Sequence, residues 1–221
     1  MNKVAKQLLS ITLCLAMLAS FCLLSPIKSE AAEYYKDYTT VKVIENTLGC
    51  YSMQGCDSDD TYIYCTKIKG DTEDKAILLR VNRDGSTNEE LLTNGDTGTQ
   101  YFTQLGHSND LDVATINGVK TMWVATGGAG SGDYSLVRFD INGKTLTQSG
   151  HYNVKYDGSS TYLASAQVMS VEGDQIHLIC KRSKYIYTCT IGVNQTSGDV
   201  NLTLLCTLDL ANTVLNGSVK D

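Results

Sequence analysis

The chain has 221 residues, and its 24 acidic residues outnumber its 18 basic ones, which gives a formal net charge of −6. This balance argues against nucleic-acid binding, which needs a basic surface, and against attraction to anionic membranes. One Pro, 19 Gly and 13 Tyr are typical of turn-rich β-structure. No segment after residue 32 shows sustained helical periodicity. The composition therefore predicts an all-β protein with no nucleic-acid partner.

Residues 1–31 have the pattern of a signal peptide. A basic start precedes an apolar run at residues 8–24, and small residues surround an expected cleavage point after Ala31. The run is short for a membrane span, which needs about 20 apolar residues, and no second run of spanning length follows. Removal of 1–31 takes away three lysines and one glutamate and leaves 15 basic and 23 acidic residues, a net charge of −8. We expect a secreted or cell-surface protein without membrane insertion after signal removal.

Residues 32–47 are a lead-in with a strand expected at 40–44, and a repeat domain is expected over 48–221. In each repeat, a stretch of alternating apolar and polar residues is followed by a turn and a second such stretch. Arg80 and Arg138, 58 positions apart, hold the same place in the first two copies. Asp-Gly and Asn-Gly pairs supply the tight turns between strands. The expected copies lie at about 48–95, 102–155 and 160–210.

A recurrence of roughly 40–60 residues with four strands per unit is typical of β-propeller blades. The predicted fold is therefore all-β, with propeller-type repeats of four-stranded antiparallel sheets and about three blades. Known propellers close with roughly four to eight blades, so three would be an incomplete propeller with open edges. Three interpretations stay open: part of a longer protein, self-association through the open sheet edges, or an open stack of sheets.

The six cysteines after the signal segment have two interpretations. Cys50 and Cys56 flank a turn and are the best local candidates for a disulfide. Cys65 and Cys180 hold a position where the second copy has Ala125, which indicates a small buried apolar site. No Cys-x-x-Cys motif or Cys/His zinc spacing occurs, so structural zinc is not expected.

Residues 106–110, Gly-His-Ser-Asn-Asp, form the most pointed motif, at the entrance to the second copy. In a propeller these side chains would face the central axis, so His107, Asn109 and Asp110 are candidate ligand-binding residues. Asn109 and Asp110, together with Asp57, are candidate ligands of a divalent cation, and calcium is the one cofactor considered. The alternative is a loop in which Asn and Asp cap local backbone groups.

Four short sequences carry a resemblance to known proteins: Gln-Gly-Cys-Asp at 54–57, Tyr-Ile-Tyr at 62–64, Leu-Gly-His-Ser-Asn-Asp at 105–110 and Trp-Val-Ala at 123–125. They resemble a group of uncharacterised secreted propeller-like proteins of Gram-positive bacteria and, more distantly, the helveticin-like class III bacteriocins. The resemblance covers about 50–145. It implies a propeller fold and an exported protein.

Asn109-Asp110 before a strand, with Asn117-Gly118 before Trp123, is also similar to a metal-ligand segment of gluconolactonase-type propellers. This similarity implies a cation-dependent lactonase with Asn109 and Asp110 as ligands and His107 near the substrate. The third copy has no matching Asn-Asp pair, so Asp57 or Asp59 would complete the site.

Two functions follow from these patterns. The leading hypothesis is a non-enzymatic secreted or surface module that recognises an extracellular glycan or protein through loops at one end of the sheets, with a bacteriocin-like antagonist as a special case. The alternative is a divalent-cation-dependent hydrolase of lactonase type. The enzyme needs a metal and a convergent acid–base set, whereas the module needs only an exposed binding surface.

Overall fold

A computed structural model describes residues 39–69, 72–127, 134–208, 214–215 and 218–219 of the chain. The chain divides into two units, Met1–Thr39 and Thr40–Asp221, and the second carries the described structure. The expected signal peptide, 1–31, and the first part of the lead-in lie outside the described residues. Within the described ranges, no helix is long and apolar enough to cross a membrane.

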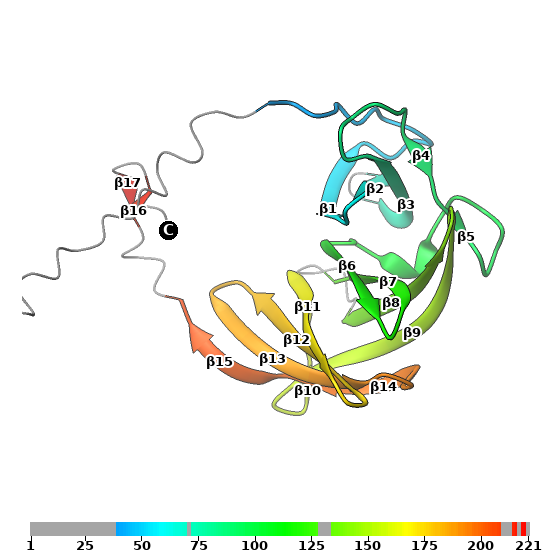
Figure 1. The fold of residues 1–221 in the computed structure, drawn as a ribbon. Helices are drawn as coiled ribbons and strands as arrows, with labels where there is room; N and C mark the ends of the chain where they lie inside the picture. The colour runs from blue at the N-terminus through cyan, green and yellow to red at the C-terminus, as the bar shows by residue number, and fades with distance from the viewer. Residues whose placement is uncertain (1–38, 70–71, 128–133, 209–213, 216–217, 220–221) are drawn as a thin grey trace, which may run out of the picture. The chain divides into compact units, whose positions relative to one another are not determined.

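Three antiparallel sheets follow one another along the chain (Figure 1), which confirms the predicted all-β, propeller-type repeats. The first and third sheets each have four strands. The first runs in the order β1 (Ser52–Ser58), β2 (Tyr62–Lys69), β3 (Thr72–Asn82), β4 (Glu90–Leu91). The third runs in the order β11 (Ser165–Glu172), β12 (Gln175–Arg182), β13 (Tyr185–Gly192), β15 (Thr203–Thr207).

The middle sheet is larger than predicted, with seven strands. Both β5 and β14 pair with β9 in parallel. The sequence had placed their residues in the first and third repeats. Two further backbone hydrogen bonds hold the same edge of β9: Gly95 N donates to Leu146 O, and His151 N donates to Thr196 O. The strands are β6 (Asp110–Ile116), β7 (Val119–Ala125), β8 (Ser135–Asn142), β9 (Thr145–Tyr156), β10 (Ser159–Ser160), β5 (Thr93–Asn94) and β14 (Ser197–Asn201). Outside the sheets lie a 3-10 turn, η1 (Thr103–Leu105), and the pair β16 (Val214–Leu215) and β17 (Ser218–Val219).

The lead-in forms no strand at 40–44, contrary to the sequence-based prediction. Its backbone is instead held by a side chain of the first sheet: the Lys67 ammonium donates to Glu45 O and Asn46 Oδ1, both at 2.9 Å, and to Ile44 O at 3.4 Å. Lys67 is only 2% exposed. A buried ammonium with several acceptors is satisfied, so the segment is fixed without a ladder of strand hydrogen bonds.

The middle sheet is buried on both faces, because neighbouring residues of a strand point to opposite sides. Met122 and Val124 of β7 pack against residues of the first sheet such as Tyr64. Trp123, between them, is fully buried in a second hydrophobic cluster, together with residues of the third sheet, and stacks on Tyr152 at 6.0 Å between ring centroids. The two hydrophobic clusters therefore fill the spaces between consecutive sheets.

The register corrects one detail of the repeat alignment. Tyr64 pairs with Arg80 and Trp123 pairs with Arg138, so the counterpart of Cys65 in the second sheet is Val124, not Ala125. A shift of one residue places a side chain on the opposite face of a strand. The expected burial of Cys65 and Cys180 is confirmed, with 3% and 1% exposed.

An aspartate in the first strand of a sheet binds the backbone of the next sheet. Asp57 Oδ2 accepts from Val113 N at 2.7 Å, and Asp112 Oδ2 accepts from Val168 N at 3.0 Å. Both bonds span the same sequence separation, 56 residues. Beside the first bond, a Cβ on Gly55 would lie 2.7 Å from the backbone carbonyl carbon of Asp110, so only glycine permits this approach of β1 to β6.

An arginine in the third strand of the same sheets makes the second connection. Arg80 Nη1 donates to Gly143 O at 2.7 Å, and Arg138 Nη1 donates to Val193 O at 3.0 Å. Each acceptor lies just after the third strand of the next sheet. Each guanidinium also lies over an aromatic ring, Tyr62 for Arg80 and Trp123 for Arg138. Both arginines are 7% exposed, so these bonds are shielded from water.

On the first three strands of each of these two sheets, the aspartate lies opposite an aromatic residue, which in turn lies opposite the arginine. We call each such set of three cross-strand partners a junction ladder. The partners of the third sheet at these positions are Gln167, Ile179 and Thr188, and Gln167 is exposed. The third sheet therefore carries no ladder for a further sheet. The two ladders are Asp57–Tyr64–Arg80 and Asp112–Trp123–Arg138.

We expect Arg138→Ala to lower the free energy of unfolding by about 3 kcal/mol, because it leaves buried carbonyl groups without a charged donor. Arg138→Lys should recover less than half of this loss, since an ammonium cannot reproduce the planar fork of donors. Urea unfolding followed by tryptophan fluorescence measures both values. Arg83→Ala is the matched control, because the exposed Arg83 side chain makes one hydrogen bond among the described residues, to Asp59 O, and should change stability by less than about 0.5 kcal/mol. Equal losses at Arg83 and Arg138 would contradict the role of the ladder.

Candidate functional site

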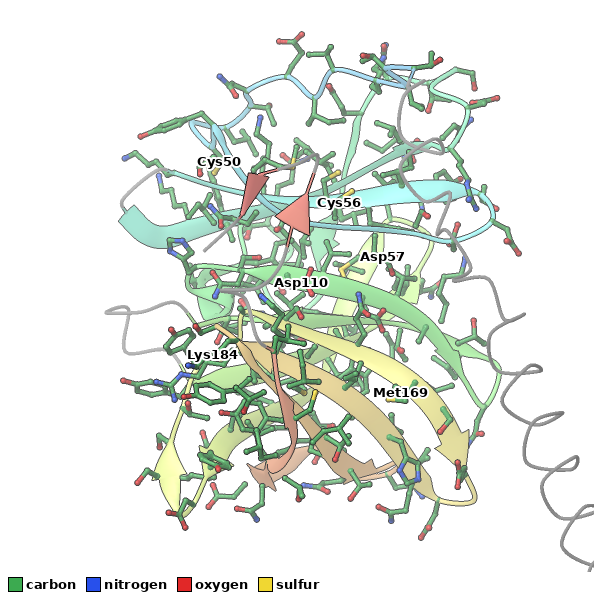
Figure 2. All side chains as sticks on the ribbon, turned by 90° about the vertical axis from the view of Figure 1, so that its left-hand side faces the viewer. Cys50, Cys56, Asp57, Asp110, Met169 and Lys184 are labelled. Atoms are coloured by element: carbon green, nitrogen blue, oxygen red, sulfur yellow. The ribbon has the colours of Figure 1, made fainter. Side chains whose placement is uncertain are left out.

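The first strands of the three sheets, β1, β6 and β11, lie next to one another, and the predicted site residues gather where they meet. Figure 2 shows Asp57 and Asp110 in this region, with Cys56 nearby. His107 is half-buried, and its backbone N–H donates to Thr126 O at 2.8 Å. The Asn109 amide donates to Gly127 O and, at 3.0 Å, to Leu163 O. Asn109 thus uses its nitrogen to hold together two segments that lie 18 and 54 positions away in the chain, whereas the capping alternative expected local backbone partners.

Asp110 is the predicted residue with the most unusual surroundings. Its Oδ2 is buried and has no hydrogen-bond partner among the described residues, and the same holds for Ser108 Oγ. Burial raises the pKa of the Asp110 carboxyl to about 6, and the charges of Asp112 and Asp57 add to this rise. The N–H groups of Leu111 and Ala166 oppose it. Asp110 therefore takes up a proton at a higher pH than an exposed aspartate does.

Asp112, which was not among the predicted site residues, has a similar environment. Burial raises the pKa of Asp112 to about 6, the N–H of Val168 opposes the rise, and the charge of Asp57 adds to it. The spacing of Asp57 and Asp112, 55 positions, was the available signal, because both hold the same place in their repeats. Asp57, expected as a metal ligand, uses one carboxylate oxygen in the first ladder. Among the described residues, no group of three or more His, Cys, Asp or Glu side chains could hold a metal ion.

Asp59, the other acidic residue considered for the cation, is paired with a base. Burial alone would raise its pKa, but the Lys120 ammonium at 2.5 Å, the N–H groups of Tyr62 and Thr61 and the Tyr64 hydroxyl together lower it to about 2. Lys120 belongs to β7 and Asp59 to the turn before β2, so the pair connects the first two sheets. It has a structural role.

The predicted Cys50–Cys56 disulfide is not present in the structure. Cys50 is buried, and its thiol lies 3.6 Å from Lys75 O. Cys56 lies instead opposite Cys65 in the β1–β2 pair, with the two sulfur atoms 3.6 Å apart. The turn at residues 47–50 precedes β1 rather than closing a hairpin with it, so β1 carries Cys56 away from Cys50 and towards β2.

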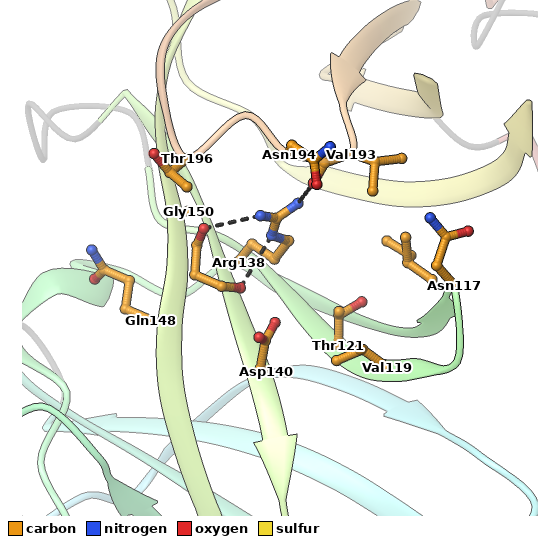
Figure 3. Close-up of a pocket in the computed structure, with 12 residues that line it drawn as sticks. Asn117, Val119, Thr121, Arg138, Asp140, Gln148, Gly150, Val193, Asn194 and Thr196 are labelled. Carbon is orange, nitrogen blue, oxygen red and sulfur yellow. Dashed lines mark hydrogen bonds between the residues drawn. The ribbon is translucent and has the colours of Figure 1, made fainter. Parts of the chain in front are cut away.

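A cavity of about 600 Å³ lies on the middle sheet beside the segment that follows β13 (Figure 3). Its size is in the range of small-molecule sites. Arg138 lies at its base, but the guanidinium is already bonded to Ser149, Val193 and Gln195 and is not available for a ligand anion. No sequence motif indicated this cavity. Its polar lining side chains are Asn117, Thr121, Asp140, Gln148, Ser149, Asn194 and Thr196.

Four of the uncharged side chains among these are open to a ligand, and so is the Asp140 carboxylate, which has no hydrogen bond to another described residue. Asn117, Gln148, Asn194 and Thr196 make no side-chain hydrogen bond to another described residue, whereas the hydroxyl of Thr121 donates to Ala114 O. They come from three places in the chain: the β6–β7 turn, β9, and the segment between β13 and β14. The cavity thus offers several uncommitted amide and hydroxyl groups on a fixed base.

No protein-family model matches the chain, and no curated protein matches it. Among solved structures, it is similar to Mala s 1, the major allergen of Malassezia sympodialis, with a TM-score of 0.39 and 16% identity over 71% of this chain and 42% of that one. It is also similar to a GH43 β-xylosidase/α-arabinofuranosidase from a compost microbial metagenome, with a TM-score of 0.40 and 12% identity over 67% of this chain and 54% of that one. The chain spans about half the length of these proteins. At these scores, neither likeness indicates a function.

We expect the melting temperature to rise as the pH is lowered from about 7.5 to about 5. Asp110 and Asp112 have a pKa near 6 in the folded chain against 3.8 for an ordinary carboxyl, so the folded state binds more protons in this window. Stability therefore falls as pH rises from about 4 to about 6. Asp112→Asn should flatten the dependence while its amide oxygen still accepts from Val168. The measurement is a series of thermal melts for both proteins.

Asp59 provides the contrast, because its pKa is lowered and its contribution is lost only as pH falls from about 4 towards 2. A wild-type melting temperature that decreases steadily from pH 7.5 to 5, or an unchanged slope in Asp112→Asn, would contradict the proposed carboxyl environment.

Proposed function

We propose that this chain is a non-enzymatic binding module that holds a neutral oligosaccharide in the cavity of Figure 3. The observation that carries the proposal is the set of uncommitted amide and hydroxyl groups of Asn117, Gln148, Asn194 and Thr196. Sugar hydroxyl groups both donate and accept hydrogen bonds, and side-chain amides do the same. The net charge of −6 favours a neutral ligand over a polyanion.

The number of acidic residues that line the cavity favours binding over hydrolysis. Asp140 is the one carboxylate among its described lining residues. Glycoside hydrolysis uses a pair of carboxyl groups on opposite sides of the scissile bond. The half-buried acids Asp110 and Asp112 do not line the cavity. The arrangement thus supports recognition better than bond cleavage.

The expected location fits the same function. An extracellular glycan is the natural ligand of a secreted or cell-surface module, and a bacteriocin-like antagonist would use such binding to reach its target. Secretion, signal cleavage at residue 31 and self-association through open sheet edges stay predictions.

The test measures binding to soluble neutral oligosaccharides, N-acetylated and unacetylated, by isothermal titration calorimetry. We expect Asn117→Ala with Asn194→Ala to weaken binding at least about tenfold, since each lost hydrogen bond contributes about 1 kcal/mol. Asn88→Ala is the matched control, because Asn88 is exposed, belongs to the first repeat and lies outside the cavity.

Three outcomes would contradict the proposal. The first is the absence of binding to every sugar, which would favour a protein ligand. The second is equal weakening in the control variant. The third is the appearance of new reducing ends, which would show that the chain is an enzyme.

A divalent-cation hydrolase is the second candidate, because Asp110 Oδ2 is buried without a partner among the described residues. Under the binding-module proposal, we expect the melting temperature to be the same in calcium chloride and in chelator, for the wild type and for Asp110→Asn. An increase with calcium in the wild type that is lost in Asp110→Asn would favour the hydrolase. In that case lactone and ester substrates would be the first to screen.

A further inference from the structure

Two pairs of cysteine thiols lie close together in the described structure. The Cys56 and Cys65 sulfur atoms are 3.6 Å apart, and those of Cys180 and Cys189 are 3.8 Å apart. Each pair spans nine positions along the chain. Sulfur distance alone does not distinguish the pairs, but strand register does.

Cys56 and Cys65 are directly opposite each other in the antiparallel β1–β2 pair. Opposite residues in such a pair have Cα atoms about 4.5–5.5 Å apart, inside the 4.4–6.8 Å range of disulfides. In the third sheet Cys180 is opposite Tyr187, and Cys189 is opposite Leu178, so the two cysteines are diagonal neighbours. Diagonal neighbours lie about 7–8 Å apart, which is too far for a disulfide without backbone movement.

Access also separates the two pairs. Cys56 is exposed, whereas Cys180 and Cys189 are both buried. Cys56 and Cys65 line a cavity of about 280 Å³ together with apolar residues such as Met53 and Val81. A small disulfide reagent can therefore reach Cys56 and be held beside Cys65.

We propose that Cys56 and Cys65 form a dithiol that small organic disulfides oxidise to a cross-strand disulfide between β1 and β2. The Cys65 thiol donates to the Cys56 sulfur and lowers the pKa of Cys56 to about 7, although burial and the charges of Asp57 and Asp110 oppose this shift. A substantial fraction of Cys56 is then the reactive thiolate at neutral pH. The same hydrogen bond, together with burial, raises the pKa of Cys65.

The reaction has two exchange steps. The Cys56 thiolate attacks one sulfur of the reagent, the S–S bond of the reagent breaks, and the first reagent thiol leaves with a proton from solvent. Cys65 then loses its proton to solvent and attacks the Cys56 sulfur of the mixed disulfide, and the second reagent thiol leaves in the same way. Two protein thiols are oxidised and one reagent disulfide is reduced to two thiols.

The oxidant for the test is 2-hydroxyethyl disulfide, which is neutral and avoids repulsion by Asp57 and Asp110. Folded wild-type protein is incubated with it and alkylated, then cleaved chemically after Met53 and enzymatically before Asp57. These cuts place Cys50, Cys56 and Cys65 in separate fragments, so mass spectrometry identifies the linked pair without any variant. We expect the Cys56 and Cys65 fragments to be joined and Cys180 and Cys189 to stay alkylated.

Each other outcome overturns the proposal. Joining of the Cys50 and Cys56 fragments would restore the pairing expected from sequence. Joining of Cys180 to Cys189 under the same conditions would show that register does not select the pair. A reagent adduct on Cys56 that never resolves would show that Cys65 cannot attack, and no reaction at all would show that Cys56 is not a reactive thiol. In Cys65→Ser, we expect the stable mixed disulfide on Cys56, which confirms that Cys65 performs the second step.

Discussion

The architecture depends on bonds from side chains of one sheet to the backbone of the next. In both junction ladders, the aspartate accepts from a valine N–H and the arginine donates to a carbonyl beyond the third strand. The aromatic residue between them packs into the hydrophobic cluster that separates the sheets. The neighbouring sheet contributes only backbone groups to these bonds, so its side chains give no sequence signal of the connection. The Asp, aromatic and Arg residues of a ladder all belong to one sheet.

This asymmetry explains what the sequence could and could not predict. The alternation of apolar residues and the Asn-Gly and Asp-Gly turns were enough for three antiparallel sheets. The spacing of Arg80 and Arg138 marked the repeat. The partner of Asp57 is the backbone N–H of Val113, and such a group leaves no pattern in the sequence. Asp57 was therefore interpreted as a metal ligand. The parallel pairing of β14 with β9 was missed for the same reason, since it joins segments of two repeats.

The site was predicted in part. Asp57 and Asp110 do lie near each other, but Asn109 uses its amide to bind Gly127 and Leu163. The cavity of Figure 3 was not predictable from motifs, because its polar side chains come from three separate segments that meet only in the fold. The Cys56–Cys65 pair depends likewise on the register of β1 and β2, which a shift of one residue would destroy.

The parallel partners of β9 have a consequence for how the chain is made. During synthesis β6 to β9 emerge well before β14, and β10 to β13 must be completed between them. Until β14 docks, part of the outer edge of β9 has unpaired N–H and C=O groups, which are a template for a strand of another molecule. An intermediate with β6 to β9 formed and β14 undocked is therefore prone to aggregate. By pairing with β9, β14 of the third repeat thus protects the edge of the second repeat's sheet from pairing with another molecule.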